Sequence, residues 1–251
     1  MTSLDTYLNL CTQVYDLSKP TPPNNAYEFY RSYAAAANGR ILEPMCGTGR
    51  FLLPLIAEGF DVSGFDRSQS MLDALHKKAN AKSLKVNVWL GSAEDVKLQK
   101  KYKLIFIPSG SFCLITDLKA AKQALIQFYD LLENEGKLVF EVETLKSVPM
   151  PIGLWRGSSW EKEDGKIILG NFLTLPIEDN IINVICRYEL VDKNSLIKTE
   201  IEKIPVKIYD PQILCNILTE IGFTQIKILK AFDPTTPPSD DDESIIFECI
   251  K

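Results

Sequence analysis

The fold is decided by the stretch Ile41-Leu42-Glu43-Pro44-Met45-Cys46-Gly47-Thr48-Gly49-Arg50-Phe51-Leu52, which joins an apolar run to a helical pattern. Ile41 and Leu42 are typical of the end of a buried strand. Gly47 and Gly49 carry no Cβ atom, so the backbone can turn sharply there and approach a ligand. Apolar residues recur at helical spacing over residues 50–58, so the turn opens onto a helix N-terminus. Such a junction in an α/β sheet commonly holds a nucleotide-type cofactor.

The charges around this turn indicate which cofactor it holds. A second alternating run ends in Asp66, seventeen residues after Gly49, and an acid there can accept both hydroxyl groups of a ribose. A dinucleotide site needs the pattern G-x-G-x-x-G and an anion at the helix N-terminus, but Leu52 replaces the third glycine and Glu43 repels phosphate. A carboxylate at that point suits a cationic ligand. S-adenosylmethionine fits, because it has a ribose for Asp66, no phosphate, and an ammonium group for Glu43.

These residues resemble the first motif of the class I S-adenosylmethionine-dependent methyltransferases, an acidic residue followed a few residues later by G-x-G. The chain departs from the family at Met45, where the family more often has its first glycine. The resemblance covers about residues 38–142 and 209–251. It implies a doubly wound, seven-stranded Rossmann-like methyltransferase sheet in an α/β fold, with S-adenosyl-L-methionine as cofactor.

Composition excludes several other classes of protein. The 251 residues are 45% hydrophobic and 24% charged, as in globular proteins, and the net charge of −5 disfavours a nucleic-acid surface. No apolar run reaches about 18 residues and no secretory signal is evident at the N-terminus, so we expect no membrane span. Six scattered cysteines without a C-x-x-C pair, and a single histidine, disfavour a zinc site. A cytoplasmic protein with free thiols is the expectation.

Hydrophobic patterns predict alternating strands and helices, and hence a parallel sheet wound on both faces. Helices are expected over residues 68–80, capped by Ser68, and over 117–132, closed by a turn at 133–136. Strands are expected over 85–90, 104–107 and 137–142. A ligand should then lie at the carboxyl ends of the strands.

The alternation of strands and helices ends after residue 145. Strands over 166–169, 181–188 and 199–206, separated by turn signals, predict an inserted antiparallel β meander. A helix over 211–221 capped by Gly222, and strands over 224–231 and 244–250, then complete the α/β pattern. The predicted organisation is an N-terminal helical lid at 1–37, a cofactor-binding α/β domain at 38–144 and 209–251, and the insertion at 145–208.

The resemblance assigns further positions to the cofactor. The main-chain N–H of Ala93 would donate to the adenine, and Ser92, which stands where the family often has an acid, either contacts the adenine or is a plain loop residue. Met71 either packs on the adenine face or belongs to the core. The implied cofactor-binding set is Tyr15, Glu43, Met45, Gly47, Gly49, Asp66, Arg67, Met71, Ser92, Ala93, Glu94, Ser109 and Gly110.

Candidate catalytic and acceptor residues come partly from this resemblance and partly from the residues themselves. By the resemblance the loop of Ser109, Gly110 and Ser111 would line the cleft near the methyl group, with a simple turn as the alternative, and Ser111 is a candidate catalytic residue. Glu141 and Glu143 leave the fifth strand on one face, and Glu143 is the candidate base, with a solvated acid as the alternative. Aromatic and cationic residues are candidates for the acceptor site, although each could instead only pack the fold: Tyr30, Trp155, Arg156 and Trp160.

The function expected is transfer of a methyl group to nitrogen or oxygen of a small molecule by in-line displacement. Positioning alone can lower such a barrier by about 7–11 kcal/mol, which agrees with the absence of a nucleophile motif. The insertion is placed like that of glycine N-methyltransferases and aminosugar N,N-dimethyltransferases, so it would cover the acceptor or form a homodimer contact. The alternatives are a non-catalytic S-adenosylmethionine-binding protein and, less favoured, an NAD-dependent oxidoreductase. Nucleic-acid and membrane partners are not expected.

Overall fold

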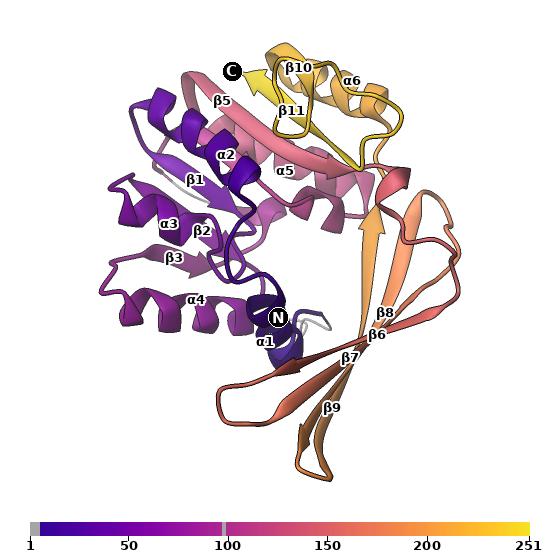
Figure 1. Cartoon of the computed structure of the whole chain (residues 1–251). Coiled ribbons are helices and arrows are strands. Elements are labelled where there is room, and N and C mark those ends of the chain that lie inside the picture. Colours follow the sequence, from indigo (N-terminus) through magenta and orange to yellow (C-terminus); the bar gives the residue numbers. More distant parts are fainter. Residues whose placement is uncertain (1–5, 97–98) are drawn as a thin grey trace.

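A computed structural model describes residues 6–96 and 99–251 as two β-sheets joined by helices (Figure 1). Sheet A has seven strands in the order β10-β11-β5-β4-β1-β2-β3. The strands β1 to β5 run parallel, whereas β11 runs antiparallel to both β5 and β10. Their bounds are β1 (Ile41–Pro44), β2 (Val62–Asp66), β3 (Asn87–Leu90), β4 (Tyr102–Ile107), β5 (Leu132–Glu143), β10 (Thr224–Lys230) and β11 (Ser244–Ile250). The predicted fold class is confirmed.

Helices cover both faces of sheet A. The helices α2 (Asn24–Ala37), α3 (Leu52–Ala57) and α4 (Gln69–Ala81) pack on one face, and α5 (Leu118–Leu131) and α6 (Pro211–Ile221) pack on the other. On the central strand β4, Leu104 and Phe106 face the core under α2, α3 and α4. Ile105 and Ile107 face the core under α5 and α6. A strand buried on both faces needs a continuous apolar run, which is why the sequence predicted β4.

The predicted helix boundaries have a local chemical cause. The Ser68 hydroxyl accepts the Met71 N–H at 3.2 Å, and the Asp117 carboxylate accepts the Ala120 N–H at 2.8 Å. Gly222 ends α6 with φ at +113°, a conformation that favours glycine. One boundary differs from the prediction: the expected turn at 133–136 lies inside β5, because this strand begins directly after α5.

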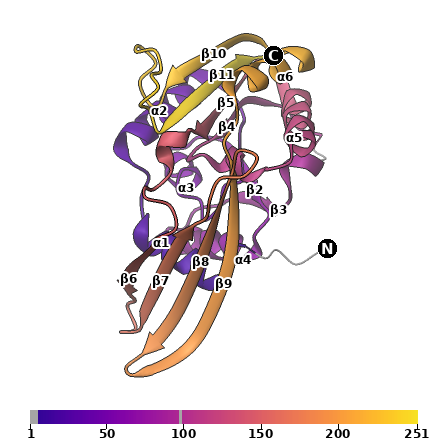
Figure 2. The same cartoon turned by 90° about the vertical axis from the view of Figure 1, so that its right-hand side faces the viewer.

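Sheet B is an antiparallel meander of four strands in the order β6-β7-β8-β9, and it extends away from sheet A (Figure 2). Its strands are β6 (Trp155–Glu161), β7 (Ile167–Thr174), β8 (Ile181–Asp192) and β9 (Ser195–Lys207). The sequence indicated the last three but not β6. The first strand lies at the edge of the sheet and is largely exposed, so its residues lack the apolar alternation that marked the others.

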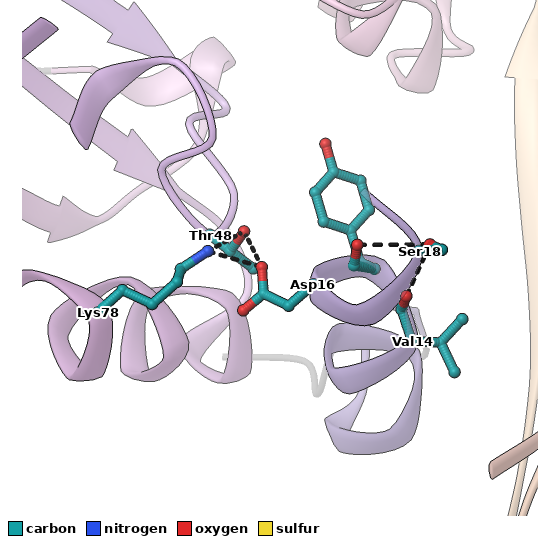
Figure 3. Close-up of polar contacts among 6 residues, drawn as sticks. Val14, Asp16, Ser18, Thr48 and Lys78 are labelled. Atoms are coloured by element: carbon teal, nitrogen blue, oxygen red, sulfur yellow. Dashed lines mark hydrogen bonds and ion pairs between the residues drawn. The ribbon is translucent and has the colours of Figure 1, made fainter. Parts of the chain in front are cut away.

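Helix α1 (Asn9–Ser18) lies between sheet B and α4 (Figure 1). Its residues Leu10, Cys11 and Val14 pack against apolar side chains of β7 and β8. On the opposite side Asp16 accepts hydrogen bonds from Thr48 Oγ1 and Lys78 Nζ, both at 2.6 Å (Figure 3). Helix α1 therefore contacts sheet B on one side, and the glycine turn and α4 on the other. In the described ranges, 6–96 and 99–251, no helix is long and apolar enough to cross a membrane.

Candidate active site

A cavity of about 560 Å³ opens at the carboxyl ends of β1, β2, β4 and β5. Its walls come from the loops after these strands, from α1 and the residues before it, and from residues 203–206 of β9. The expected position of a ligand in an open α/β sheet is this edge. Because β9 closes one side, sheet B contributes to the same cavity.

The glycine turn has the geometry that its sequence demands. Met45, Gly47 and Gly49 all have positive φ angles, of 57°, 53° and 78°. Met45 therefore occupies the left-handed region, a conformation that favours the glycine expected at this position from the resemblance. A Cβ on Gly47 would find no atom nearer than Met71 Sδ at 4.0 Å, so this glycine leaves room beside the cavity.

Gly49 is required for close helix packing, whereas Gly47 borders the cavity. A Cβ at Gly49 would lie 2.9 Å from Leu75 Cγ and 3.0 Å from Leu53 Cγ. This glycine does not line the cavity and instead lets α3 and α4 pack closely under the turn. Of the two turn glycines that the sequence assigned to the cofactor, only Gly47 borders the space for it.

Asp66 ends β2 and presents its carboxylate to the cavity. Its two oxygens accept the N–H groups of Gly47 and Ser68, each at 2.8 Å. Burial raises the pKa of Asp66, although these backbone N–H groups act in the opposite direction. A carboxylate oxygen can accept more than one hydrogen bond, so both oxygens retain capacity for ribose hydroxyl groups.

Glu43 lies directly below the turn and is 2% exposed. Its Oε2 atom has no hydrogen-bond partner, and burial raises the pKa of this carboxyl group well above its usual range. The nearby Arg50 opposes that shift. A buried carboxyl group with a raised pKa ionises most readily beside a positive charge, so this acid beneath an open glycine cradle fits a ligand that carries an ammonium group.

Arg50 joins the turn to the opposite wall of the cavity. Its guanidinium donates to Ser109 Oγ at 2.5 Å and lies 5.5 Å from the centre of the Tyr15 ring. Sequence reasoning took Arg50 only as the start of a helix, and no local pattern distinguishes it. The arrangement places a fixed positive charge near the rim, which suits the carboxylate of an amino-acid moiety.

Glu143 and Gly110 form the far wall. Gly110 has φ at +64°, and a Cβ there would lie 2.8 Å from Glu143 Cγ, so only glycine admits this acid beside the loop. Glu143 accepts a hydrogen bond from Ser147 Oγ at 3.1 Å, and burial raises its pKa. Glu141, on the same strand, accepts the Ser109 N–H at 2.7 Å and thereby holds the loop rather than facing the cavity.

Most of the sequence-predicted site residues meet at this cavity. Those that line it are Tyr15, Met45, Gly47, Asp66, Arg67, Met71, Ala93, Glu94, Ser109, Gly110, Ser111 and Glu143. Glu43, Gly49 and Ser92 do not line it, and the Ser92 hydroxyl donates to Glu94 instead.

The four predicted acceptor residues lie elsewhere. Tyr30 is fully buried, with its ring 5.3 Å from the Phe106 ring, because α2 packs on the face of the sheet. Trp155 is 54% exposed on the edge strand β6, and Arg156 donates to the backbone carbonyl of Pro151. Trp160 packs in the core between sheet B and α1. None of these four side chains lines the cavity, so the structure does not bring them together with the predicted cofactor residues.

Other lining residues were missed by sequence reasoning. They are Thr6, Tyr7, Lys19, Leu114, Ile115, Thr116, Lys203, Ile204, Pro205 and Val206. The β9 segment reaches the cavity only through the tertiary placement of sheet B, so no local pattern could have indicated it. No cluster of three or more metal-ligating side chains occurs in the described part of the chain.

Known proteins match this chain in sequence and in fold. The profile of the methyltransferase domain family matches residues 41–136. A provisionally named methyltransferase of Geobacillus sp. (strain WCH70) is 26% identical over 135 residues, 52% of this chain and 55% of that protein. The glycine/sarcosine N-methyltransferase of Aphanothece halophytica is 26% identical over 104 residues, 41% of this chain and 39% of its own length. The matched region thus spans about half, or less, of the length of these curated relatives.

Solved structures share the whole fold. An S-adenosylmethionine-dependent methyltransferase from Clostridium acetobutylicum ATCC 824 superposes with a TM-score of 0.78 at 16% identity, covering 95% of this chain and 96% of that one. The sugar N-methyltransferase KedS8 from Streptoalloteichus sp. ATCC 53650 also gives 0.78 at 16% identity, covering 100% and 96%. At this identity the likeness concerns the fold. Together with the domain match at residues 41–136, it confirms the resemblance of this chain to the class I S-adenosylmethionine-dependent methyltransferases.

Proposed function

We propose that this protein is an S-adenosylmethionine-dependent methyltransferase that acts on a nitrogen or oxygen atom of a small molecule. The observation that carries the proposal is the pair of acids at one cradle: Asp66 lines the cavity, and Glu43, whose Oε2 atom has no hydrogen-bond partner, is buried beneath the glycine turn. Asp66 would bind the ribose, Glu43 would neutralise the ammonium group, and Ala93 would border the adenine. Relatives whose names describe methyltransferases support this reading.

The chain's own residues would mainly position the reactants. When bound, S-adenosylmethionine supplies an electrophilic methyl group on a sulfonium centre. Ser109, Gly110, Ser111 and Glu143 line the cavity; the first three would border the methyl group, and Glu143 would hold the proton that the acceptor loses. Holding the two reactants in line accounts for about 7–11 kcal/mol of barrier lowering, and a base adds roughly 10²–10⁴-fold.

The first test is binding of the cofactor. Calorimetric titration of the wild type with S-adenosylmethionine, S-adenosylhomocysteine and NAD should show binding of the first two only. Asp66→Asn should weaken both, because it removes the charge that accepts the ribose hydroxyls. The matched control Asp61→Asn changes an acid just before β2, outside the cavity, and should bind like the wild type. Binding of NAD alone would favour the oxidoreductase alternative and overturn the proposal.

Catalysis is tested separately from binding. A panel of amines and hydroxyl compounds is incubated with methyl-labelled cofactor, and labelled product is measured. Cofactor binding without transfer to any acceptor class would favour the non-catalytic alternative. A small-molecule acceptor is supported by the size of the cavity, about 560 Å³, and by the sugar and glycine N-methyltransferases among the similar proteins.

Assembly and location are part of the proposal. Sheet B exposes the apolar side chains of Ile167, Leu169 and Ile201, which supports the homodimer contact expected through the insertion. Sedimentation of the wild type and of Ile201→Lys tests this contact. The acidic net charge supports a protein without a nucleic-acid partner, and the unpaired cysteines support a cytoplasmic location.

A further inference from the structure

Three buried side-chain atoms of the described residues have no hydrogen-bond partner: Tyr30 Oη, Glu43 Oε2 and Arg50 Nε. Buried polar atoms in folded proteins are nearly always paired, so each exception needs an explanation. These three belong to α2, to β1 and to the glycine turn. Tyr30 Oη is a donor and Glu43 Oε2 is an acceptor, and the two side chains are close enough for the Glu43 charge to act on Tyr30.

The strands place Tyr30 between two acids. Ile41 on β1 packs in the core with Tyr30, and Glu43, two residues later, points to the same face. By the same alternation Glu141 on β5 shares the face of Val139. The strand between them is β4, and the Tyr30 ring lies over its Phe106. The phenol thus lies above the central strand with one carboxylate on each side.

The two acids differ in what they already bind. Glu141 accepts the Ser109 N–H at 2.7 Å, whereas Glu43 Oε2 accepts nothing. Burial, and then Glu141 and Glu43, raise the pKa of Tyr30, so its hydroxyl stays protonated and can donate. An unpaired donor and an unpaired acceptor that make no direct bond are commonly joined by an ordered water, which forms two to four hydrogen bonds.

We propose that Tyr30 is a positioning residue for the amino end of the cofactor, through an ordered water that its hydroxyl shares with Glu43. The water fixes the Glu43 carboxylate in the orientation that receives the ammonium group. Neither Tyr30 nor Glu43 lines the cavity, so Tyr30 acts only through Glu43, which would receive the ammonium group from beneath the open glycine turn. This inference rests on the proposed function, because it assumes a ligand with an amino-acid moiety.

The test uses Tyr30→Phe and two ligands that differ only at that end. S-adenosylhomocysteine carries the amino-acid moiety, and 5′-methylthioadenosine lacks it. In calorimetric titrations we expect the variant to bind S-adenosylhomocysteine about 3–10-fold more weakly, the worth of one hydrogen bond, with unchanged affinity for 5′-methylthioadenosine. The free variant should melt at the same or a higher temperature, because phenylalanine removes an unpaired buried hydroxyl.

Tyr33→Phe is the matched control on the same helix. The Tyr33 hydroxyl donates to Glu248 Oε2 at 2.5 Å, away from the glycine turn, so this variant should lose thermal stability and keep its affinity for S-adenosylhomocysteine. Equal weakening of both ligands by Tyr30→Phe, or no weakening, would overturn the inference. A wild type that binds neither ligand would instead overturn the proposed function.

Discussion

Replacing Lys78 by methionine should loosen helix α1 from the glycine turn. Lys78 Nζ donates to Asp16 Oδ1 at 2.6 Å and to Thr48 Oγ1 at 2.9 Å, and Thr48 Oγ1 itself donates to Asp16 (Figure 3). Thr48 is fully buried between the two turn glycines. The substitution keeps most of the side-chain volume and removes only the charge and its hydrogen bonds.

The expected cost follows from exposure. The Lys78 and Asp16 side chains are 31% and 27% exposed, so solvent partly screens the pair, and a contribution of about 1–2 kcal/mol is expected with the bond to Thr48. For a chain of this size, 1 kcal/mol corresponds to roughly 2–4 °C. Calorimetry should therefore show a melting temperature about 2–8 °C lower. The control Lys77→Met, at the exposed neighbouring position, should change stability by no more than about 0.5 kcal/mol.

A double-mutant cycle isolates the contact. Asp16→Asn, Lys78→Met and the double variant are unfolded in urea, and residues in contact should show a coupling energy of at least about 0.5 kcal/mol. Single effects that add to within about 0.3 kcal/mol would refute the reasoning, as would a Lys78→Met variant as stable as Lys77→Met. Either result would mean that Asp16, Thr48 and Lys78 are solvated independently in solution.

Three further predictions concern other parts of the site. Gly49→Ala should destabilise the fold by about 1–3 kcal/mol in urea titrations, because its Cβ would lie 2.9 Å from Leu75 Cγ at a positive φ. Glu143→Gln should lower kcat about 10²–10⁴-fold with cofactor affinity unchanged. Burial raises the pKa of Glu143, and a base must be ionised to act. Wild-type kcat should therefore decrease as the pH is lowered, beginning at a pH above the usual glutamate range, and the variant should lack this decrease. Glu202→Gln should accelerate hydrogen exchange at the Leu8 amide, which its Oε1 accepts at 2.9 Å.

Sheet A was predictable because its signals are local. The continuous apolar run of β4 follows from burial on both faces, and Ser68 marks a helix start by capping its own first turn. The glycine turn and Asp66 were likewise visible, since each depends on a conformation or a charge within about twenty residues. For the same reason most of the residues that the sequence assigned to the cofactor line the cavity.

The acceptor side was not predictable, because it depends on contacts between distant segments. Trp155 and Trp160 looked like rim residues in sequence, but β6 is an edge strand and β9 reaches the cavity instead. Tyr30 was assigned to a lid, whereas the face of the sheet buries it. Aromatic composition alone does not distinguish a ligand contact from a core contact, since both bury apolar surface.

Helix α1 shows how a segment without a motif becomes part of the site. Glu202 accepts the N–H groups of Tyr7 and Leu8, 195 and 194 residues away, so β9 fixes the start of the helix. Asp16 fixes its other end to the glycine turn. Tyr15 lies between these attachments and lines the cavity, so sheet B and the cofactor turn jointly determine its position. Helix α1 therefore joins the β9 wall of the cavity to the wall formed by the glycine turn.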